Sequence, residues 1–212
     1  LPLALAASSA SGEAEVREGS ASGETLVRGA TYMAVVRSGG ELVSLKTSAG
    51  TELLHEGAGS ATFNALDHAF WRAPTDNDRG GGDVFFPWAA PMMPRSMLSL
   101  ARQWRNVGLE EAGTRHVDVT WKGSQLLVDS EHRLRNKPPL FFIRTLISFG
   151  ATTIKLQVNV RPNAKSGMRR LPSLPRVGLR LLLNPSLANL SWLGCGPHEC
   201  YPDRKASAPF NV

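Results

Sequence analysis

The sequence predicts an all-β fold, an antiparallel sandwich of two sheets. Residues 153–160 alternate strictly between apolar and polar side chains, which indicates a strand with one face packed inward and the other in water. Residues 141–149 and 177–183 carry further rows of apolar side chains on one face. Clusters of Pro, Gly and Asn separate these runs. Short strands divided by turn signals are typical of a β-sandwich.

The first 29 residues are expected to be a flexible linker or the remnant of an upstream domain. Residues 7–25 are dominated by Ser, Gly, Ala and Glu, a composition poorly suited to building a core. Residues 1–10 are apolar, but they lack an initiating Met and a positive segment, so they do not qualify as a signal peptide. We expect the folded domain to span residues 30–212 and the chain to be a fragment of a longer polypeptide.

Two further elements follow from spacing within the domain. Residues 116–121 alternate in the manner of a strand and place one apolar row on a single face, formed by Val117, Val119 and Trp121. Between residues 97 and 104 the spacing changes to that of one face of a short helix, formed by Met97, Leu100, Ala101 and Trp104. We expect this helix to plug or flank the sheets.

Composition excludes some classes of partner. The formal charge of +6 comes from Arg and Lys residues scattered along the chain, without an RNA-binding signature. We interpret the charge as a basic solvated or inter-domain surface and expect no nucleic acid partner. No apolar run approaches the roughly 20 residues needed to span a bilayer, so no membrane partner is expected.

The two cysteines, Cys195 and Cys200, lie in one segment with His198. A structural zinc site takes about four ligands, and this single cluster is too small, so we expect no metal here. Whether the two thiols form a disulfide stays open. Nothing in the sequence indicates an oxidising compartment. The compartment itself stays unknown, and a cytoplasmic location is favoured over secretion.

Two polar strings are the best guide to function. Residues 70–78 read FWRAPTDND, and residues 194–204 read GCGPHECYPDR. Their polar groups are costly to bury without partners, so both strings are expected to be shaped polar loops. In the first, Pro74 fixes a turn that Thr75 and Asp76 close, and Arg72 clamps a carboxylate with two hydrogen bonds.

The three glycines at 80–82 follow the first string and indicate a hinge. The segment beyond them, through Phe85, Phe86 and Trp88, is then either a mobile gate or an ordinary solvent loop. Its aromatic rings suit the C–H faces of a sugar, but filling a core explains Phe85 and Phe86 nearly as well.

These strings resemble the C-terminal domain (small chain, domain 5-type) of bacterial-type β-galactosidases, in glycoside hydrolase family two. The resemblance continues through residues 174–180 and 192–194 in the same order. It departs at Cys200, where the family usually has Asn, and at Cys195, where Arg or Leu is common. It implies a galactose mutarotase-like, antiparallel two-sheet supersandwich, truncated at its C-terminal end.

The resemblance also implies a function, the hydrolysis of terminal non-reducing β-D-galactose residues. A retaining glycosidase needs two carboxyl groups about 5 Å apart. In this family both are glutamates of a (β/α)8 barrel, and no strand–helix repeat of that kind occurs in this sequence. The barrel is therefore expected in an upstream domain or a large subunit, as part of a homo-oligomeric enzyme. This chain is expected to support the active site, to bind β-galactoside or galactose, and to be inactive alone. No cofactor is expected in it, because the family's Mg and Na lie outside this domain.

No residue of this chain is assigned a catalytic role. A position near the substrate or at the domain interface is expected for Trp71, Arg72, Asp76, Asn77, Asp78, His198, Glu199, Asp203 and Arg204. Asp76 and Asp78 are a weak catalytic pair, since carboxylates beside arginines are more often ion-paired. Two alternatives stay open: an aldose 1-epimerase-like mutarotase that uses His198 and Glu199, and a non-catalytic carbohydrate-binding module.

Overall fold

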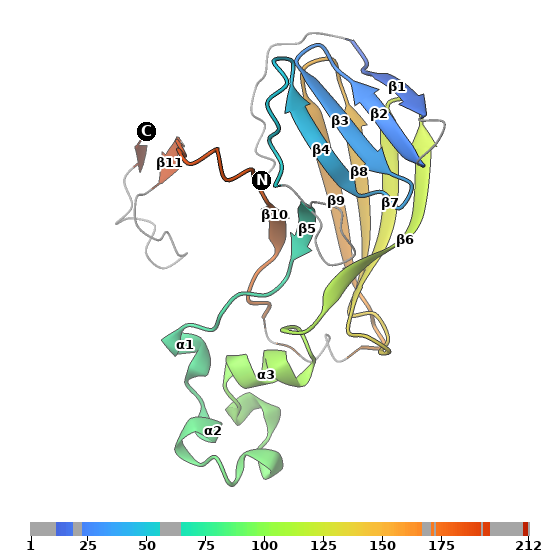
Figure 1. The fold of residues 1–212 in the computed structure, drawn as a ribbon. Coiled ribbons are helices and arrows are strands. Elements are labelled where there is room, and N and C mark those ends of the chain that lie inside the picture. Colours follow the sequence, from blue (N-terminus) through green and yellow to red (C-terminus); the bar gives the residue numbers. More distant parts are fainter. Residues whose placement is uncertain are drawn as a thin grey trace.

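The fold is a sandwich of two four-stranded antiparallel sheets, stacked face to face (Figure 1). The computed structural model describes residues 12–18, 23–55, 65–166, 171, 173–191, 193–195, 210 and 211. The first sheet has the order β1-β2-β3-β4 and is a simple meander, with the strands β1 (Glu15–Glu18), β2 (Glu24–Arg28), β3 (Tyr32–Arg37) and β4 (Leu42–Thr47).

The second sheet is also a meander, in the order β6-β7-β8-β9, and its strands are longer. They are β6 (Gly113–Lys122), β7 (Gln125–Arg133), β8 (Phe141–Phe149) and β9 (Ile154–Pro162). Strand β8 follows the predicted alternation: Phe141, Ile143, Thr145, Ile147 and Phe149 are buried.

The main core lies between the two sheets. The first sheet contributes side chains such as Val27, Ala34 and Val36, and the second contributes Leu126 and Ile147 among others. Because each sheet buries one face and turns the other outward, the alternating pattern appears in both. The predicted all-β, two-sheet antiparallel class is confirmed.

Shorter pairs connect the sandwich to the rest of the chain. Strand β5 (Leu66–Ala69) pairs with β10 (Gly178–Leu181), which brings together segments more than a hundred residues apart. Strand β11 (Gly194–Cys195) pairs with β12 (Phe210–Asn211).

A helical lobe lies below the sandwich in Figure 1, between β5 and β6. It contains α1 (Asp76–Arg79), α2 (Gly82–Phe85), the 3-10 turns η1 (Ala90–Met92) and η2 (Arg95–Met97), and α3 (Leu100–Asn106). Helix α3 is the predicted one, with Ala101 and Trp104 buried; Met97 belongs to the preceding turn.

Part of the segment expected to be a linker is instead in the first sheet. Strand β1 pairs with β2, and Ala14 and Val27 are buried in the main core. The linker expectation is therefore wrong for these residues. Their alternation, with Val16 facing the core and Glu15 and Arg17 exposed, was hidden by the surrounding Ser and Gly.

Two predicted apolar rows differ from expectation. In β6 the pairing shifts between His116 and Asp118, so that Val117 is 60% exposed while Val119 and Trp121 pack against the core. A β-bulge adds one residue to a strand, which moves the side chain at the bulge to the other face. The second row lies in and around β10, and its side chains are not buried in a core formed by described residues. They are 44–64% exposed, at Val177, Leu179, Leu181 and Leu183.

Among the described residues, no helix has the length and apolar character required to cross a membrane.

Candidate functional site

The first polar string forms a closed turn held by Arg72 and Asp78. Arg72 donates from Nη1 to Asp78 Oδ2 at 2.5 Å and from Nη2 to Oδ1 at 3.2 Å. Thr75 donates to the same carboxylate from its backbone N at 2.7 Å and from Oγ1 at 2.8 Å. The predicted two-pronged clamp by Arg72 is confirmed. Asp78, rather than Asp76, closes the turn, because an acid at the third position of α1 reaches back to the residue that precedes the helix.

The Asp78 carboxylate is held in its ionised form. Burial alone raises the pKa of this carboxyl, but hydrogen bonds from Arg72 and Thr75 and the charge of Arg72 outweigh burial and hold the pKa below its usual range. Asp76 and Asn77, which follow Thr75 on α1, are exposed. The two aspartates therefore differ in role, since one is buried and fully engaged and the other faces solvent.

Arg72 also ties the turn to distant parts of the chain. Its Nε donates to the Pro175 carbonyl at 2.9 Å, and its guanidinium lies 5.6 Å from the centroid of the Trp104 ring. Trp104 donates from Nε1 to the Ser173 carbonyl at 2.9 Å, and Trp71 packs edge-on against it. The turn, α3 and the segment around Pro175 thus form one packed unit.

The helical lobe has a second buried acid at Asp83. Its Oδ1 accepts from the Ser99 backbone N at 2.5 Å, and its Oδ2 accepts from Ser99 Oγ at 3.0 Å. Ser99 in turn caps α3 by accepting from the backbone N of Arg102 at 3.3 Å. This brace fixes the start of α2 against the start of α3.

The segment from residue 85 to residue 97 exposes several large apolar side chains. Phe85 and Phe86 do not fill a core, because their exposed fractions are 74% and 53%. Trp88, Met92 and Met97 are also more than half exposed. We call these five side chains the lobe surface. A contiguous sequence segment with this many exposed large apolar side chains is typical of an interaction site.

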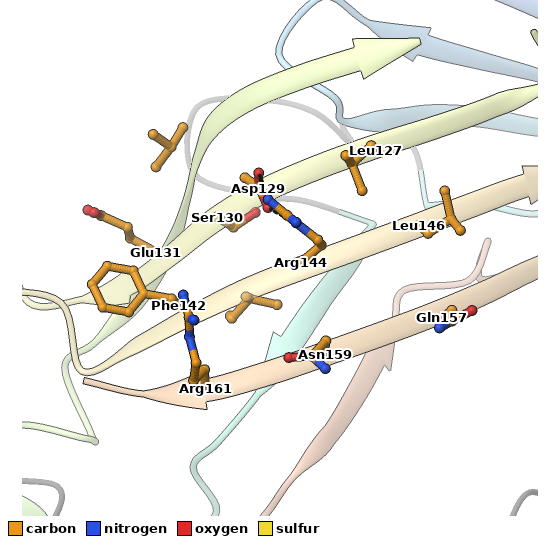
Figure 2. Close-up of a pocket in the computed structure, with 12 residues that line it drawn as sticks. Leu127, Asp129, Ser130, Glu131, Phe142, Arg144, Leu146, Gln157, Asn159 and Arg161 are labelled. Carbon is orange, nitrogen blue, oxygen red and sulfur yellow. Dashed lines mark hydrogen bonds and ion pairs between the residues drawn. The ribbon is translucent and has the colours of Figure 1, made fainter. Parts of the chain in front are cut away.

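The outer face of the second sheet carries an open depression of about 590 Å³ (Figure 2). It is lined by apolar side chains such as Phe142 and by charged and amide side chains. Arg144 spans from β8 to β7 and donates to both oxygens of Asp129 at 2.8 Å. The hydrogen bonds from Arg144 lower the pKa of the Asp129 carboxyl and outweigh its partial burial.

Two histidines lie on the inner side of the same sheet: His132 on β7 is buried, and His68 on the neighbouring β5 is half-buried. His68 Nε2 is 3.0 Å from Thr145 Oγ1, and His132 Nδ1 is 3.2 Å from Thr114 Oγ1. Burial lowers the pKa of both imidazoles, that of His132 to about 4. Both rings are therefore neutral at physiological pH, and they serve packing: the His132 ring contacts Phe70 edge-on.

Comparison with known proteins identifies the family. A family described as the β-galactosidase small chain matches residues 29–212. This chain belongs to the β-galactosidase small-chain family. It is 36% identical to a β-galactosidase of Klebsiella pneumoniae over 149 residues, which are 68% of this chain and 13% of that relative.

Two other relatives come from other organisms. A β-galactosidase of Arthrobacter sp. (strain B7) is 31% identical over 65% of this chain and 14% of its own length, and one of Kluyveromyces lactis is 28% identical over 87% and 17%. This chain thus spans less than a fifth of the length of these curated relatives.

The predicted site residues of this chain divide into two groups. Those of the first string, Trp71, Arg72, Asp76, Asn77 and Asp78, lie together in the turn and α1. Those of the second string lie outside the described residues: His198, Glu199, Asp203 and Arg204. Cys195 is exposed and forms no disulfide with another described residue, and Cys200 lies outside the described part, so their pairing stays open. No group of three His, Cys, Asp or Glu side chains that could hold a metal occurs within that part.

Two features of this chain were missed by sequence reasoning. The Asp83–Ser99 brace has a local signal, because Ser99 immediately precedes the apolar spacing of α3 and is a preferred capping residue. The depression on the second sheet has no local signal, since its side chains are contributed by four strands.

Proposed function

We propose that this chain is an accessory, non-catalytic part of a retaining β-galactosidase that removes terminal β-D-galactose residues. A (β/α)8 barrel, in a larger chain or an upstream domain, supplies the catalytic glutamates. The small chain supports that active site and contributes carbohydrate binding. The family description and the small share of each relative that this chain spans support this division of roles.

The state of Asp78 is the observation that carries the proposal. A retaining glycosidase needs one carboxyl group that holds a proton and a second, about 5–5.5 Å away, that attacks the sugar. Asp78 cannot donate a proton, because its pKa is lowered and its oxygens accept four hydrogen bonds from Arg72 and Thr75. Nor is it free to attack, since it is only 6% exposed. We therefore assign this turn a structural role and not a catalytic one.

The lobe surface is the part we assign to contact with the barrel. It extends from the turn that carries Trp71 and Arg72, and the Asp83–Ser99 brace holds it in shape. Arg79 precedes it in sequence and Arg95 lies within it, and both suit a partner with an acidic rim. In this arrangement Asp76 and Asn77, exposed on α1, face the same partner.

A complementation assay tests the proposal. The purified chain is incubated with a nitrophenyl β-galactoside, alone and after mixing with a family β-galactosidase from which the corresponding domain has been deleted. We expect no nitrophenol from the chain alone and a restored rate in the mixture. Turnover by the chain alone, or a mixture no faster than the deleted enzyme, contradicts the proposal. Polarimetry of freshly dissolved α-galactose tests the mutarotase alternative. A mutarotase would speed the change in optical rotation, and an accessory chain of a β-galactosidase would not.

The contact surface is tested in the same assay. The double variant F85S/W88S should raise the concentration of small chain needed for half-maximal restoration by about 10-fold or more, because exposed aromatic side chains dominate interfaces. Leu190→Ser is the matched control, since Leu190 is 78% exposed but distant in sequence from the lobe. Equal effects of the two changes would remove the lobe surface from the interface.

A further inference from the structure

The outer face of the second sheet presents its side chains in an ordered array. The pairing of β7, β8 and β9 aligns three rows across the strands: Leu127, Leu146 and Gln157; Asp129, Arg144 and Asn159; and Glu131, Phe142 and Arg161. All nine line the depression (Figure 2). Neighbours within a row are about 4.8 Å apart, and successive rows are about 6.7 Å apart along the strands.

The charges in this array cancel. Asp129 and Glu131 contribute two carboxylates, and Arg144 and Arg161 contribute two guanidinium groups. A site for a phosphate or a nucleic acid carries an excess of positive charge, and a cation site carries an excess of carboxylate oxygen. Neither excess occurs among the residues that line the depression. The array therefore suits a neutral ligand rich in hydrogen-bonding groups.

In the middle row Asp129 and Arg144 hold each other in place, and the row still has capacity to bind. A guanidinium group has five N–H donors, and Asp129 accepts two hydrogen bonds from that of Arg144. The remaining N–H donors of Arg144 do not point at Asp129. The Arg144 side chain is 63% exposed. Beside it, the Asn159 amide offers both a donor and an acceptor, as a pair of adjacent sugar hydroxyls requires.

Phe142 supplies an apolar platform among these groups. Its residue is 37% exposed, although it lies on the central strand β8 of this sheet, between Glu131 and Arg161. Val117, turned outward by the β6 bulge, adds apolar surface at the margin of the depression. Aromatic rings present an apolar face to the C–H groups of a pyranose, and charged neighbours bind its hydroxyls. The depression, at about 590 Å³, lies within the size range of small-ligand sites.

We propose that the outer face of β7–β9 is a non-catalytic binding site for a neutral oligosaccharide, with Phe142 as the platform and Arg144, Asp129 and Asn159 as the hydroxyl-binding row. The identity of the sugar as a galactoside rests on the proposed function. The site binds and does not cleave, because Asp129 is paired with Arg144 and Glu131 accepts from Arg133 at 3.0 Å.

Titration of the ¹⁵N-labelled chain with β-1,4-galactotetraose tests the proposal. We expect amide shifts confined to β7, β8 and β9, with a dissociation constant that Phe142→Ala raises by roughly 2- to 12-fold. Asn159→Ala should weaken binding as well. Lys155→Ala is the matched control: Lys155 is an exposed residue of β9 outside the depression, and its loss should leave affinity unchanged. Thermal unfolding of each variant verifies that the fold is retained.

Absence of shifts on this face, shifts located elsewhere, or equal effects of the Phe142 and Lys155 changes would overturn the site. Loss of sugar binding in the complex with the deleted β-galactosidase would show instead that the face is a contact between chains. Because binding is measured without hydrolysis, the two proposals fail separately. A chain that restores hydrolysis but binds no galactotetraose refutes only the site, and one that binds it but restores nothing refutes only the accessory function.

Discussion

Replacing Asp78 by Asn tests whether the Arg72 clamp holds the turn together. The substitution removes the negative charge and turns one acceptor oxygen into a donor NH₂, which then faces the donors of Arg72 and Thr75. Breaking a fully buried ion pair costs about 3–5 kcal/mol, and an exposed pair contributes about 0–1 kcal/mol. The Asp78 side chain is 8% exposed and that of Arg72 is 27% exposed, so solvent screens the pair in part. We expect a loss of about 2–3 kcal/mol in the free energy of unfolding.

Asp76→Asn is the matched control, because it makes the same chemical change two residues away on an exposed side chain. It should alter stability by less than about 0.5 kcal/mol. Urea denaturation at pH 7 measures both variants. For a chain of this size the loss at Asp78 corresponds to a fall of about 4–12 °C in melting temperature. The double-mutant cycle with R72Q should give a coupling energy of about 1–3 kcal/mol.

The pH dependence gives an independent measurement. The folded pKa of Asp78 is lowered, so its contribution is complete above the unfolded value near 3.8 and is lost as the pH falls through the folded pKa. The stability difference between the wild type and Asp78→Asn should therefore be constant from pH 5 to pH 7 and should narrow below about pH 4. Equal stability of Asp78→Asn and wild type at pH 7, or equal losses from both aspartate changes, would refute the reasoning.

Three further predictions concern the core and the lobe. Burial lowers the pKa of His132 to about 4, so the free energy of unfolding should fall by about 3 kcal/mol as the pH drops from about 6.5 towards 4. Urea midpoints measured across this pH range test the prediction. The His132→Gln variant should show a flatter dependence of stability on pH, and a dependence parallel to that of the wild type would contradict it. Asp83→Asn leaves the backbone N–H and the hydroxyl of Ser99 poorly paired, so amide hydrogen exchange in residues 82–99 should become faster. Unchanged protection of these amides would contradict the role of the Asp83–Ser99 brace. Gly108→Ala should lower the free energy of unfolding, measured by thermal unfolding, by about 1–3 kcal/mol, because Gly108 has φ +80° and an added methyl meets a neighbouring leucine. Gly113→Ala is the control, since an added methyl there meets no atom within 4 Å. An equal loss in the two variants would contradict the argument.

Much of the sandwich could be predicted because a strand with one buried face has a period of two residues. Strand β8 shows this directly, since its predicted row from Phe141 to Phe149 is the buried row. The prediction was wrong at Val117, where a bulge interrupts the period, and for β1, where alternation over only a few residues was hidden by Ser and Gly. A bulge is set by pairing with the neighbouring strand, so the strand's own sequence does not reveal it.

The candidate site divides in the same way. The clamp of Asp78 by Arg72 could be anticipated because a Pro turn brings side chains six residues apart together. The contacts of Arg72 with Pro175 and of Trp104 with Ser173 could not, since they join segments 103 and 69 residues apart. Only the packing of α3 against the returning chain creates them.

By itself, the sequence determined the all-β class, the strand period, the polar turn and the likeness to the β-galactosidase small chain, because each is written in consecutive residues. The tertiary structure alone decided that Asp78 is the engaged acid and that the aromatic lobe surface is exposed. It also decided which side chains of β7, β8 and β9 stand in common rows. The physical reason is that register and burial depend on which strands become neighbours, and that choice is made by the packing of the whole core.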